Sequence, residues 1–378
     1  MQLLYLMNAF KDTMTSSRLN QLLEEELSEY PAFSFPFSDG GDGFLDSMEA
    51  LHPGCRKEET DISFPIGNKR HKAEYLIFQN KAYLESAEAI GYRLSDKKDV
   101  YHATSYPLGE MIKAILQKDL TEIHIGLGGS ITNDMGSGML SALGMRFLDI
   151  NGKEIFPYPD NLNSIKEIDS SAFDKRTINL SVFLYEDVKN PLLGPDGATY
   201  RFAIQKGARK ESLPFLEQGM RNLNEVYTSS SGRDHSEEEG TGAAGGLSMA
   251  FLDFFRTKTL SGSRYFLSHP KIKDAIRKSD LLFTGEGRID STSFEGKGSV
   301  TLLKEAEKLH PGIRSVLLVG SIEEEAKRRL KKEYPHTLLL TMCSNAMDYP
   351  IGERRKKAEE IFRKTIELNL STIQDMIE

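Results

Sequence analysis

Residues 122–144 read EIHIGLGGSITNDMGSGMLSALG and hold the densest set of residues in the chain that could do chemistry. A short apolar run leads into Gly128, Gly129 and Ser130, and a glycine- and alanine-rich pattern typical of a helix follows. Glycines let backbone N–H groups approach an anion closely, and a helix N-terminus favours negative charge. The order strand, glycine loop and helix therefore predicts a phosphate or carboxylate site, to which Asn133 adds a polar side chain. A tight turn without a ligand would use the same glycines, so that interpretation stays open here.

Other glycine-rich stretches fit known nucleotide motifs less well. Residues 240–245 read GTGAAG and match the dinucleotide pattern G-x-G-x-x-G, but an acidic segment precedes them instead of an apolar strand. Residues 296–299 read GKGS and lack the earlier glycine of a P-loop. The chain also lacks the H-R-D and D-F-G motifs of protein kinases and the H-E-x-x-H motif of zinc enzymes.

Composition narrows the class of protein. The chain has 378 residues and a formal net charge of −8, which argues against nucleic acid and anionic membranes as main partners. Its two cysteines suggest no disulfide framework and fit a reducing compartment. No apolar run approaches the roughly 20 residues that span a bilayer, and the N-terminus lacks a signal pattern. We expect a soluble cytoplasmic protein of two domains.

Three polar segments follow strand candidates, at residues 8–11, 38–43 and 284–290; the second and third contain glycines, and the third leads to Lys297. In a parallel sheet these loops would meet at one edge and bring lysines, an arginine and several carboxylates together. Carboxylates beside glycines suit magnesium–phosphate chemistry, because hard cations prefer oxygen ligands and glycines leave room for phosphate. A lysine can offset phosphate charge, and an aspartate can accept a hydroxyl proton. Each Asp-Gly pair could also be a simple turn.

The apolar pattern predicts an α/β fold with two kinds of sheet. Continuous apolar strands near residues 3–7, 281–284, 315–319 and 337–341, with a weaker one at 33–37, indicate a parallel sheet covered on both faces. Residues 61–66, 73–78 and 82–85 alternate and predict antiparallel strands. We therefore predict a discontinuous Rossmann-like domain, residues 1–52 plus 272–378, with a mixed α/β domain, residues 53–271, inserted. The apolar stripe of the last helix is assigned to the core.

Seven motifs, in order, resemble those of type I glycerate kinases. They are Phe10-Lys11, Ser38–Gly43 (SDGGDG), residues 126–134 (GLGGSITND), Asn190-Pro191-Leu192, residues 205–208 (QKGA), residues 242–246 (GAAGG) and residues 284–290 (TGEGRID). The resemblance implies a two-domain α/β kinase that moves the γ-phosphoryl group of ATP to glycerate with Mg²⁺.

The chain departs from this pattern at six positions: Asn8, Ala9 and Asp12 replace the Asp, Ser and Gly of Asp-Ser-Phe-Lys-Gly, Met135 replaces a glycine, Lys189 a threonine and Thr292 a glutamine. Losing a carboxylate and a hydroxyl at positions 8 and 9 could alter contacts with the metal or the substrate. The departures leave the kinase assignment in place and bear on the choice of substrate.

With the resemblance, we predict phosphorylation of a small hydroxy-acid, first among them D-glycerate, in the cleft between the domains. Asp39 or Asp187 would orient the hydroxyl as base. Positive charge would come from Lys11, Lys297 and Arg288. The predicted magnesium ligands are Glu286, Asp290 and Asp42, and the predicted anion cradle is Gly128, Gly129, Ser130 and Asn133.

Three alternatives remain at this stage. The enzyme could phosphorylate another sugar acid, if the changes at Asn8, Ala9 and Lys189 line the substrate site. The chain could be a sensor that binds a hydroxy-acid or a nucleotide without transferring phosphate. A dehydrogenase would rest on residues 240–245 and needs a strand before Gly240. Either the 2- or the 3-hydroxyl could accept phosphate.

Overall fold

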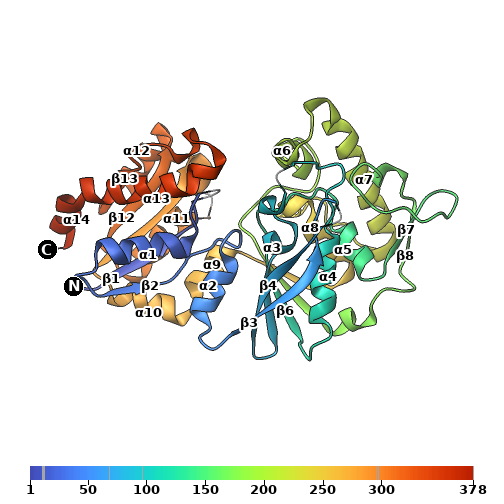
Figure 1. Cartoon of the computed structure of the whole chain (residues 1–378), viewed down its shortest axis with the longest axis horizontal. Coiled ribbons are helices and arrows are strands. Elements are labelled where there is room, and N and C mark those ends of the chain that lie inside the picture. The colour runs from blue at the N-terminus through green and yellow to red at the C-terminus, as the bar shows by residue number, and fades with distance from the viewer. Residues whose placement is uncertain (11–12, 68, 96, 295, 297, 378) are drawn as a thin grey trace. The chain divides into compact units, whose positions relative to one another are not determined.

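The computed structural model describes every residue except 11, 12, 68, 96, 295, 297 and 378. The chain forms two compact units (Figure 1): residues 1–53 with 261–378, here the first unit, and residues 54–260, here the second unit. The first has a parallel sheet and the second a mixed sheet. The predicted fold class, a discontinuous parallel-sheet α/β domain with a mixed α/β domain inserted, is confirmed. The boundaries at residues 52 and 272 stay a prediction.

The sheet of the first unit has five parallel strands in the order β13-β12-β11-β1-β2. Their bounds are β1 Leu3–Met7, β2 Ala32–Ser34, β11 Leu281–Ile289, β12 Arg314–Ile322 and β13 Thr337–Thr341. The strand from the N-terminus thus pairs with β11, which lies in the C-terminal third of the chain. Strands β11 and β12 are longer than predicted, because they continue past their apolar cores into glycine-containing ends.

Helices cover both faces of this sheet, as its continuous apolar strands require. The helices of this unit are α1 Ser16–Glu26, α2 Phe44–Leu51, α9 Gly262–Ser268, α10 Pro270–Lys278, α11 Gly298–Leu309, α12 Glu324–Glu333, α13 Ile351–Leu368 and α14 Leu370–Ile377. On one face α1 and α13 lie side by side (Figure 1). Their buried residues Leu22, Leu23 and Phe362 pack with Tyr5 and Phe283 of the strands.

The apolar stripe predicted for the last helix belongs to this core, so that assignment is confirmed. The structure divides the predicted helix in two, however, because α13 ends at Leu368 and α14 begins at Leu370. The intervening Asn369 caps the break, since its side-chain Nδ2 donates to the carbonyl oxygen of Thr365 at 2.7 Å.

The sheet of the second unit has six strands in the order β10-β9-β6-β5-β4-β3. Strands β5, β6, β9 and β10 run parallel, while β3 and β4 are antiparallel to their neighbours. The bounds are β3 Arg56–Ser63, β4 Arg70–Phe78, β5 Lys81–Glu85, β6 Glu122–Gly126, β9 Ser181–Tyr185 and β10 Arg256–Leu260, and a separate hairpin-like pair is formed by β7 Arg146–Leu148 and β8 Glu167–Asp169.

The helices of the second unit are α3 Ser86–Ile90, α4 Tyr106–Ile115, α5 Ser137–Ala142, α6 Ala198–Phe202, α7 Leu213–Ser231 and α8 Leu247–Phe254. The buried residues of its hydrophobic core come from along the whole unit, from Ile62 to Phe255. Strand β10 was not predicted, because its sequence RTKTL is polar and largely exposed, as suits the edge of a sheet. Among the described residues, no helix is both long and apolar enough to cross a membrane.

Helix α13 offers a direct test of the first core. Phe362 is fully buried, whereas Leu368 on the same helix is 64% exposed. We expect Phe362→Ala to lower the free energy of unfolding by about 3–5 kcal/mol, because it leaves a cavity beneath the sheet. Leu368→Ala should change it by no more than about 0.5 kcal/mol. Urea unfolding of both variants measures the difference, and similar losses would contradict the placement of α13.

Candidate functional site

Three polar segments of the first unit lie at one edge of the sheet: two loops follow β1 and β2, and the third predicted loop, residues 284–290, forms the end of β11. The backbone N–H of Asn8 donates to the carbonyl oxygen of Gly285 at 3.0 Å, which joins the end of β1 to β11. The N–H of Phe37 donates to the carbonyl of Met7 at 3.1 Å, which joins the next loop to the other side of β1. Asn8, the loop that contains Asp39 and the glycine-containing end of β11, which includes Glu286, therefore lie at neighbouring points, in the order that the parallel sheet predicted.

The Ser38–Gly43 loop is a tight, internally bonded turn. The N–H of Gly40 donates to Ser38 Oγ at 3.2 Å, and the N–H of Gly41 donates to Asp39 Oδ1 at 3.2 Å. The start of α9 fixes the loop from outside, since a β-carbon on Gly262 would lie 2.2 Å from the Asp39 carbonyl oxygen. The turn interpretation of the Asp-Gly pair is thus satisfied, and the same bonds hold the Asp39 carboxylate in one place.

The carboxylate of Glu286 lies against the first residue of helix α11. Gly298 has φ +61°, and a β-carbon there would lie 2.8 Å from Glu286 Oε2. A helix N-terminus stabilises negative charge, so this position suits a carboxylate or a phosphate. The next residue, Ser299, has a buried hydroxyl without a hydrogen-bond partner among the described residues, a feature that sequence reasoning missed.

Arg288 and Asp290 are engaged in a surface network near the end of β11. Arg288 Nη2 lies 2.8 Å from Glu323 Oε1, and its Nε lies 3.9 Å from Asp290 Oδ2. The hydrogen bond and charge of Glu323 raise the pKa of Arg288. Asp290 Oδ1 also accepts hydrogen bonds from the backbone N and the Oγ1 of Thr292, at 2.9 and 2.7 Å. These contacts occupy both side chains and make Glu286 the stronger candidate for a metal.

Of the remaining charged residues predicted for the site, the structure describes Asp42 but not the two lysines. Lys11 and Lys297 lie outside the described residues, so their predicted roles stay predictions. Asp42 lies in the Ser38–Gly43 loop and is half-buried. Within the described part of the chain, no group of three or more His, Cys, Asp or Glu side chains could hold a metal ion by itself.

In the second unit, the predicted glycine loop follows β6 but does not open a helix. Gly128 donates its N–H to Ser86 Oγ at 3.2 Å, and the N–H of Ile131 donates to the carbonyl oxygen of Ile90 at 2.8 Å. These bonds tie the loop to the segment after β5, and helix α5 begins only at Ser137. The predicted order of strand, glycine loop and helix is present, but Gly128 and Gly129 lie several residues before the start of the helix.

A buried lysine that the prediction of site residues omitted contacts this loop. Lys206 is 2% exposed, and its Nζ donates to the carbonyl oxygen of Thr132 at 2.6 Å and contacts Ser130 Oγ at 3.4 Å. The QKGA motif contained the signal, but sequence separation from the glycine loop hid the contact. The predicted cradle residue Ser130 is thus joined to a buried positive charge.

Asn133 and Asp134, which follow Thr132 in the chain, have different surroundings. Asn133 is fully buried; its Nδ2 donates to Thr199 Oγ1 at 3.3 Å, and its Oδ1 has no hydrogen-bond partner among the described residues. Asp134 instead organises the fold, because its carboxylate accepts bonds from the backbone N–H groups of Ser105 and Gly136, at 2.7 and 3.2 Å. Burial raises the pKa of Asp134 against the lowering effect of these hydrogen bonds.

Residues 240–246 pack directly, backbone against backbone, on the loop that follows β6 and on the loop that follows β9. A β-carbon on Gly245 would lie 2.1 Å from the Thr132 carbonyl oxygen, and one on Gly242 would lie 2.3 Å from the Pro191 carbonyl oxygen. Between the end of α7 and Gly240 the described chain contains no strand. The match to the dinucleotide pattern therefore reflects close backbone packing, and the dehydrogenase alternative lacks the strand that it requires.

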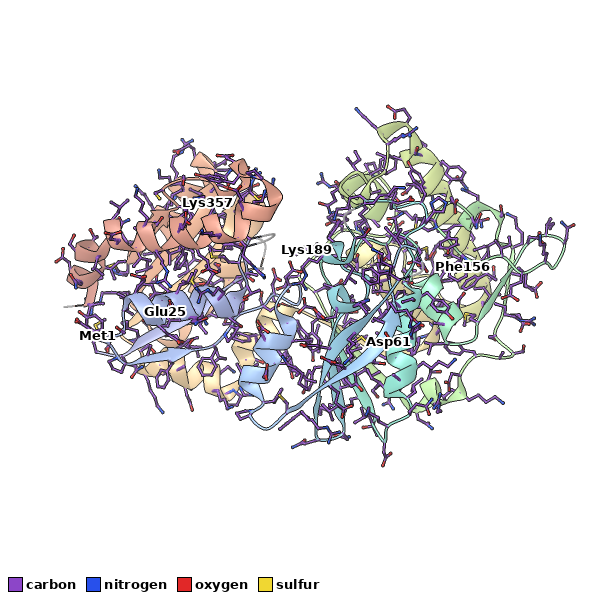
Figure 2. The ribbon with its side chains drawn as sticks, in the orientation of Figure 1. Met1, Glu25, Asp61, Phe156, Lys189 and Lys357 are labelled. Carbon is purple, nitrogen blue, oxygen red and sulfur yellow. The ribbon has the colours of Figure 1, made fainter. Side chains whose placement is uncertain are left out.

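Two consecutive acidic residues, Glu186 and Asp187, directly follow strand β9. Glu186 is buried, its Oε1 would lie 2.1 Å from a β-carbon on Gly240, and its Oε2 has no hydrogen-bond partner among the described residues. Burial, and then the charge of Asp187, raise the pKa of Glu186 well above its ordinary value. The predicted Asp187 is half-buried directly after it, and Lys189, one of the family departures, is exposed in the same loop (Figure 2).

Two glycines with the same backbone angle test the packing of this segment. Gly245 and Gly232 both have φ +74°, but only Gly245 faces another backbone, while nothing lies within 4 Å of a β-carbon on Gly232. Gly232→Ala should cost about 1–2 kcal/mol of unfolding free energy through its left-handed backbone. Gly245→Ala should cost about 1–3 kcal/mol more, because the Thr132 carbonyl must move. Equal losses in urea unfolding would refute the close approach.

Glu186 should make stability depend on pH. Because its folded-state pKa is raised, its favourable contribution is complete below the ordinary carboxyl pKa and is lost as pH rises through the raised value. We expect Glu186→Gln to gain stability relative to wild type as the pH rises from about 5 to about 8, because the wild-type carboxyl loses its favourable contribution over that rise. Urea unfolding at both pH values checks this, with the exposed Glu237→Gln as control. Parallel pH profiles for wild type and Glu186→Gln would contradict it.

Comparison with known proteins places the chain among relatives along nearly its whole length. The sequence model of the glycerate kinase family matches residues 3–368. The glycerate 2-kinase of Escherichia coli (strain K12) is 33% identical over 325 residues, which cover 84% of each chain. The glycerate kinase of Bacillus subtilis (strain 168) is 32% identical, with 86% of each chain covered.

A solved structure agrees with these relatives. The crystal structure of a Salmonella typhimurium LT2 protein named as a candidate glycerate kinase 2 superposes with a TM-score of 0.74 at 25% identity, covering 99% of this chain and 98% of that one. The resemblance seen in the seven motifs is thereby confirmed, and the chain belongs to the glycerate kinase family.

Proposed function

We propose that this protein transfers the γ-phosphoryl group of ATP to a small hydroxy-acid, first among them D-glycerate. The observation that carries the proposal is the match of the glycerate kinase family over residues 3–368. The arrangement of polar loops at the carboxyl edges of two parallel sheet regions supports it, since such edges commonly carry phosphate and substrate sites. The inter-domain location of the reaction stays a prediction.

The residues of the first unit suit the nucleotide and its metal. Glu286 beside the start of α11 would hold Mg²⁺ together with phosphate oxygens, with Asp42 and Asp290 as further candidates. When bound, Mg²⁺ would neutralise charge on the phosphates. Lys11, Lys297 and Arg288 would add positive charge around the transferring group. Asp39, fixed by its bond to the Gly41 N–H, would orient the substrate hydroxyl and accept its proton.

The residues of the second unit suit the substrate. Gly128, Gly129, Ser130 and Asn133 would form the cradle for an anionic group, and Asp187 is the second candidate for the base. Because the Escherichia coli relative is named a glycerate 2-kinase, we propose the 2-hydroxyl as the acceptor. A kinase of another sugar acid is the alternative that the departures at Asn8, Ala9 and Lys189 would favour.

The test is formation of ADP by purified protein with Mg-ATP and D-glycerate, against controls without glycerate and without magnesium. Turnover that needs both is expected, with NMR showing phosphate on the 2-hydroxyl. A panel of sugar acids separates the alternative kinase. Binding of glycerate and ATP without ADP formation would overturn the proposal in favour of a sensor.

Asp39→Asn tests the assigned base. Asparagine keeps an oxygen acceptor for the Gly41 N–H, so the loop should hold its shape while proton transfer is lost. We expect kcat to fall about 10²–10⁴-fold. The exposed Asp274→Asn in the same unit is the control. If Asp39→Asn and Lys11→Ala both retain turnover near that of wild type, the roles assigned to the first unit are wrong.

A further inference from the structure

A cavity of about 260 Å³ lies in the first unit, between the start of α1 and the first half of α13. The described residues that line it are Met14, Thr15 and Arg18 on one side and Arg355 and Glu359 on the other. Cavities that take a whole ligand of drug size measure about 300–1,000 Å³. This cavity is therefore of a size that suits part of a ligand, such as one planar ring system.

The cavity lies towards the edge of the sheet at which the parallel strands end. Helix α1 follows β1, and α13 follows β13, so both helices begin at this carboxyl edge. The wall before α1 is held there by two backbone bonds, because the N–H groups of Phe10 and Met14 each donate to the carbonyl oxygen of the other, at 2.9 and 3.0 Å. Open α/β sheets bind their ligands at the carboxyl edge, so the cavity is placed where a ligand is expected.

An ion pair joins the two walls of the cavity. Arg18 Nη2 donates to Glu359 Oε2 at 2.6 Å, and both side chains are half-buried. This hydrogen bond is the main cause that lowers the pKa of Glu359, so the side chain is an ionised acceptor at neutral pH. The pair therefore fixes the position of the Glu359 carboxylate in the wall.

Two polar groups of α13 remain available to a ligand. Glu359 Oε1 makes no hydrogen bond within the part of the chain that the structure describes, and Arg355 makes no hydrogen bond or ion pair there. A carboxylate accepts through both of its oxygens, and a guanidinium presents five N–H donors. The wall thus offers an acceptor and a set of donors one helical turn apart.

The carboxylate in the wall argues against a phosphate as the occupant. Arg18 and Arg355 bring two positive charges and Glu359 one negative charge, and the negative charge would repel phosphate oxygens. A neutral ring with a donor and an acceptor on one edge would instead satisfy both Glu359 and Arg355. Aromatic rings also pack well against a methionine sulfur and against a guanidinium plane, which Met14 and Arg18 can supply.

We propose that this cavity binds the adenine base of ATP, with Glu359 and Arg355 contacting the edge of the base. This rests on the proposed function and deepens it, because it names the residues that choose the nucleotide. Adenine carries an amino donor beside a ring-nitrogen acceptor. Glu359 Oε1 accepts from the amino group, and the guanidinium of Arg355 donates to the ring nitrogen. Guanine has a carbonyl oxygen in place of the amino group, which Glu359 repels, so the site selects ATP over GTP.

Glu359→Gln tests the predicted choice of base. Binding of ATP and of GTP is titrated by calorimetry without a hydroxy-acid, and wild type should bind ATP at least about 10-fold more tightly. Glutamine keeps an acceptor oxygen for Arg18 and gains an amide donor that suits guanine, so the preference should fall at least about 5-fold. The control is Glu360→Gln, the exposed next residue, whose Oε2 pairs with Lys357 at 2.8 Å. This variant should keep the wild-type preference.

Arg355→Ala tests the other polar group with little risk to folding, because the side chain is exposed. It should weaken the binding of ATP and of adenosine by a similar factor, about 10-fold, since both carry the base. Binding of inorganic triphosphate should stay within about 2-fold, because it carries no base. Lys356→Ala changes an exposed neighbour that is not among the described residues lining the cavity, and should alter none of these affinities.

The proposal is overturned if wild type fails to prefer ATP over GTP, or if Glu359→Gln keeps the preference with an unchanged melting temperature. It is also overturned if Arg355→Ala weakens triphosphate as much as ATP, which would assign the cavity to phosphate. If Glu359→Gln unfolds, Arg355→Ala decides.

The proposed function fails separately from this site. Binding of ATP with the predicted preference, but without ADP formation from glycerate, would remove the kinase and keep the adenine site. Equal turnover of glycerate with ATP and with GTP would keep the kinase and remove the adenine site.

Discussion

The arrangement of the loops in the second unit depends on close packing between glycine backbone and the carbonyl groups of two other loops. Gly245 lies against the carbonyl of Thr132, and Gly242 lies against that of Pro191, so one segment fills the space between two loops that follow neighbouring strands. Any side chain there would push these loops apart. The Thr132 carbonyl oxygen is also the acceptor for Lys206 Nζ, so the loop after β6, the segment of Gly245 and the turn that carries Lys206 meet at this oxygen.

The same contact separates what glycines do for structure from what they do for ligands. In this chain a glycine motif that looks like a dinucleotide fingerprint packs directly against two backbone carbonyls, and Gly128 after β6 is tied by a hydrogen bond to Ser86 at the start of α3. The charged side chain that contacts the glycine loop is Lys206, which lies more than seventy positions further along the chain. In a protein with a net charge of −8, such local placement matters more than the overall field.

The sequence predicted the apolar strands and their parallel arrangement well, because burial on both faces leaves a continuous apolar run. It predicted polar edges poorly: β10 reads RTKTL and carries no apolar signal. Of the site, the loops after β1, β2 and β11 were predicted because strand ends and polar residues are adjacent in sequence. Lys206 and the buried Glu186 were missed, because their significance arises only from burial and from contacts between distant segments.

The first unit is assembled from both ends of the chain. Strand β1 pairs with β11 in a register that joins Leu3 to Leu281, so the middle of that sheet cannot form until the last third of the protein has been made. Residues 54–260 are contiguous and contain every strand of their own sheet. During synthesis on the ribosome the second unit can therefore fold first. The apolar residues of β1 and α1 stay unpacked until β11 and α13, against which they pack, have been made. In that interval the N-terminal segment is the part of the chain that most needs protection from aggregation.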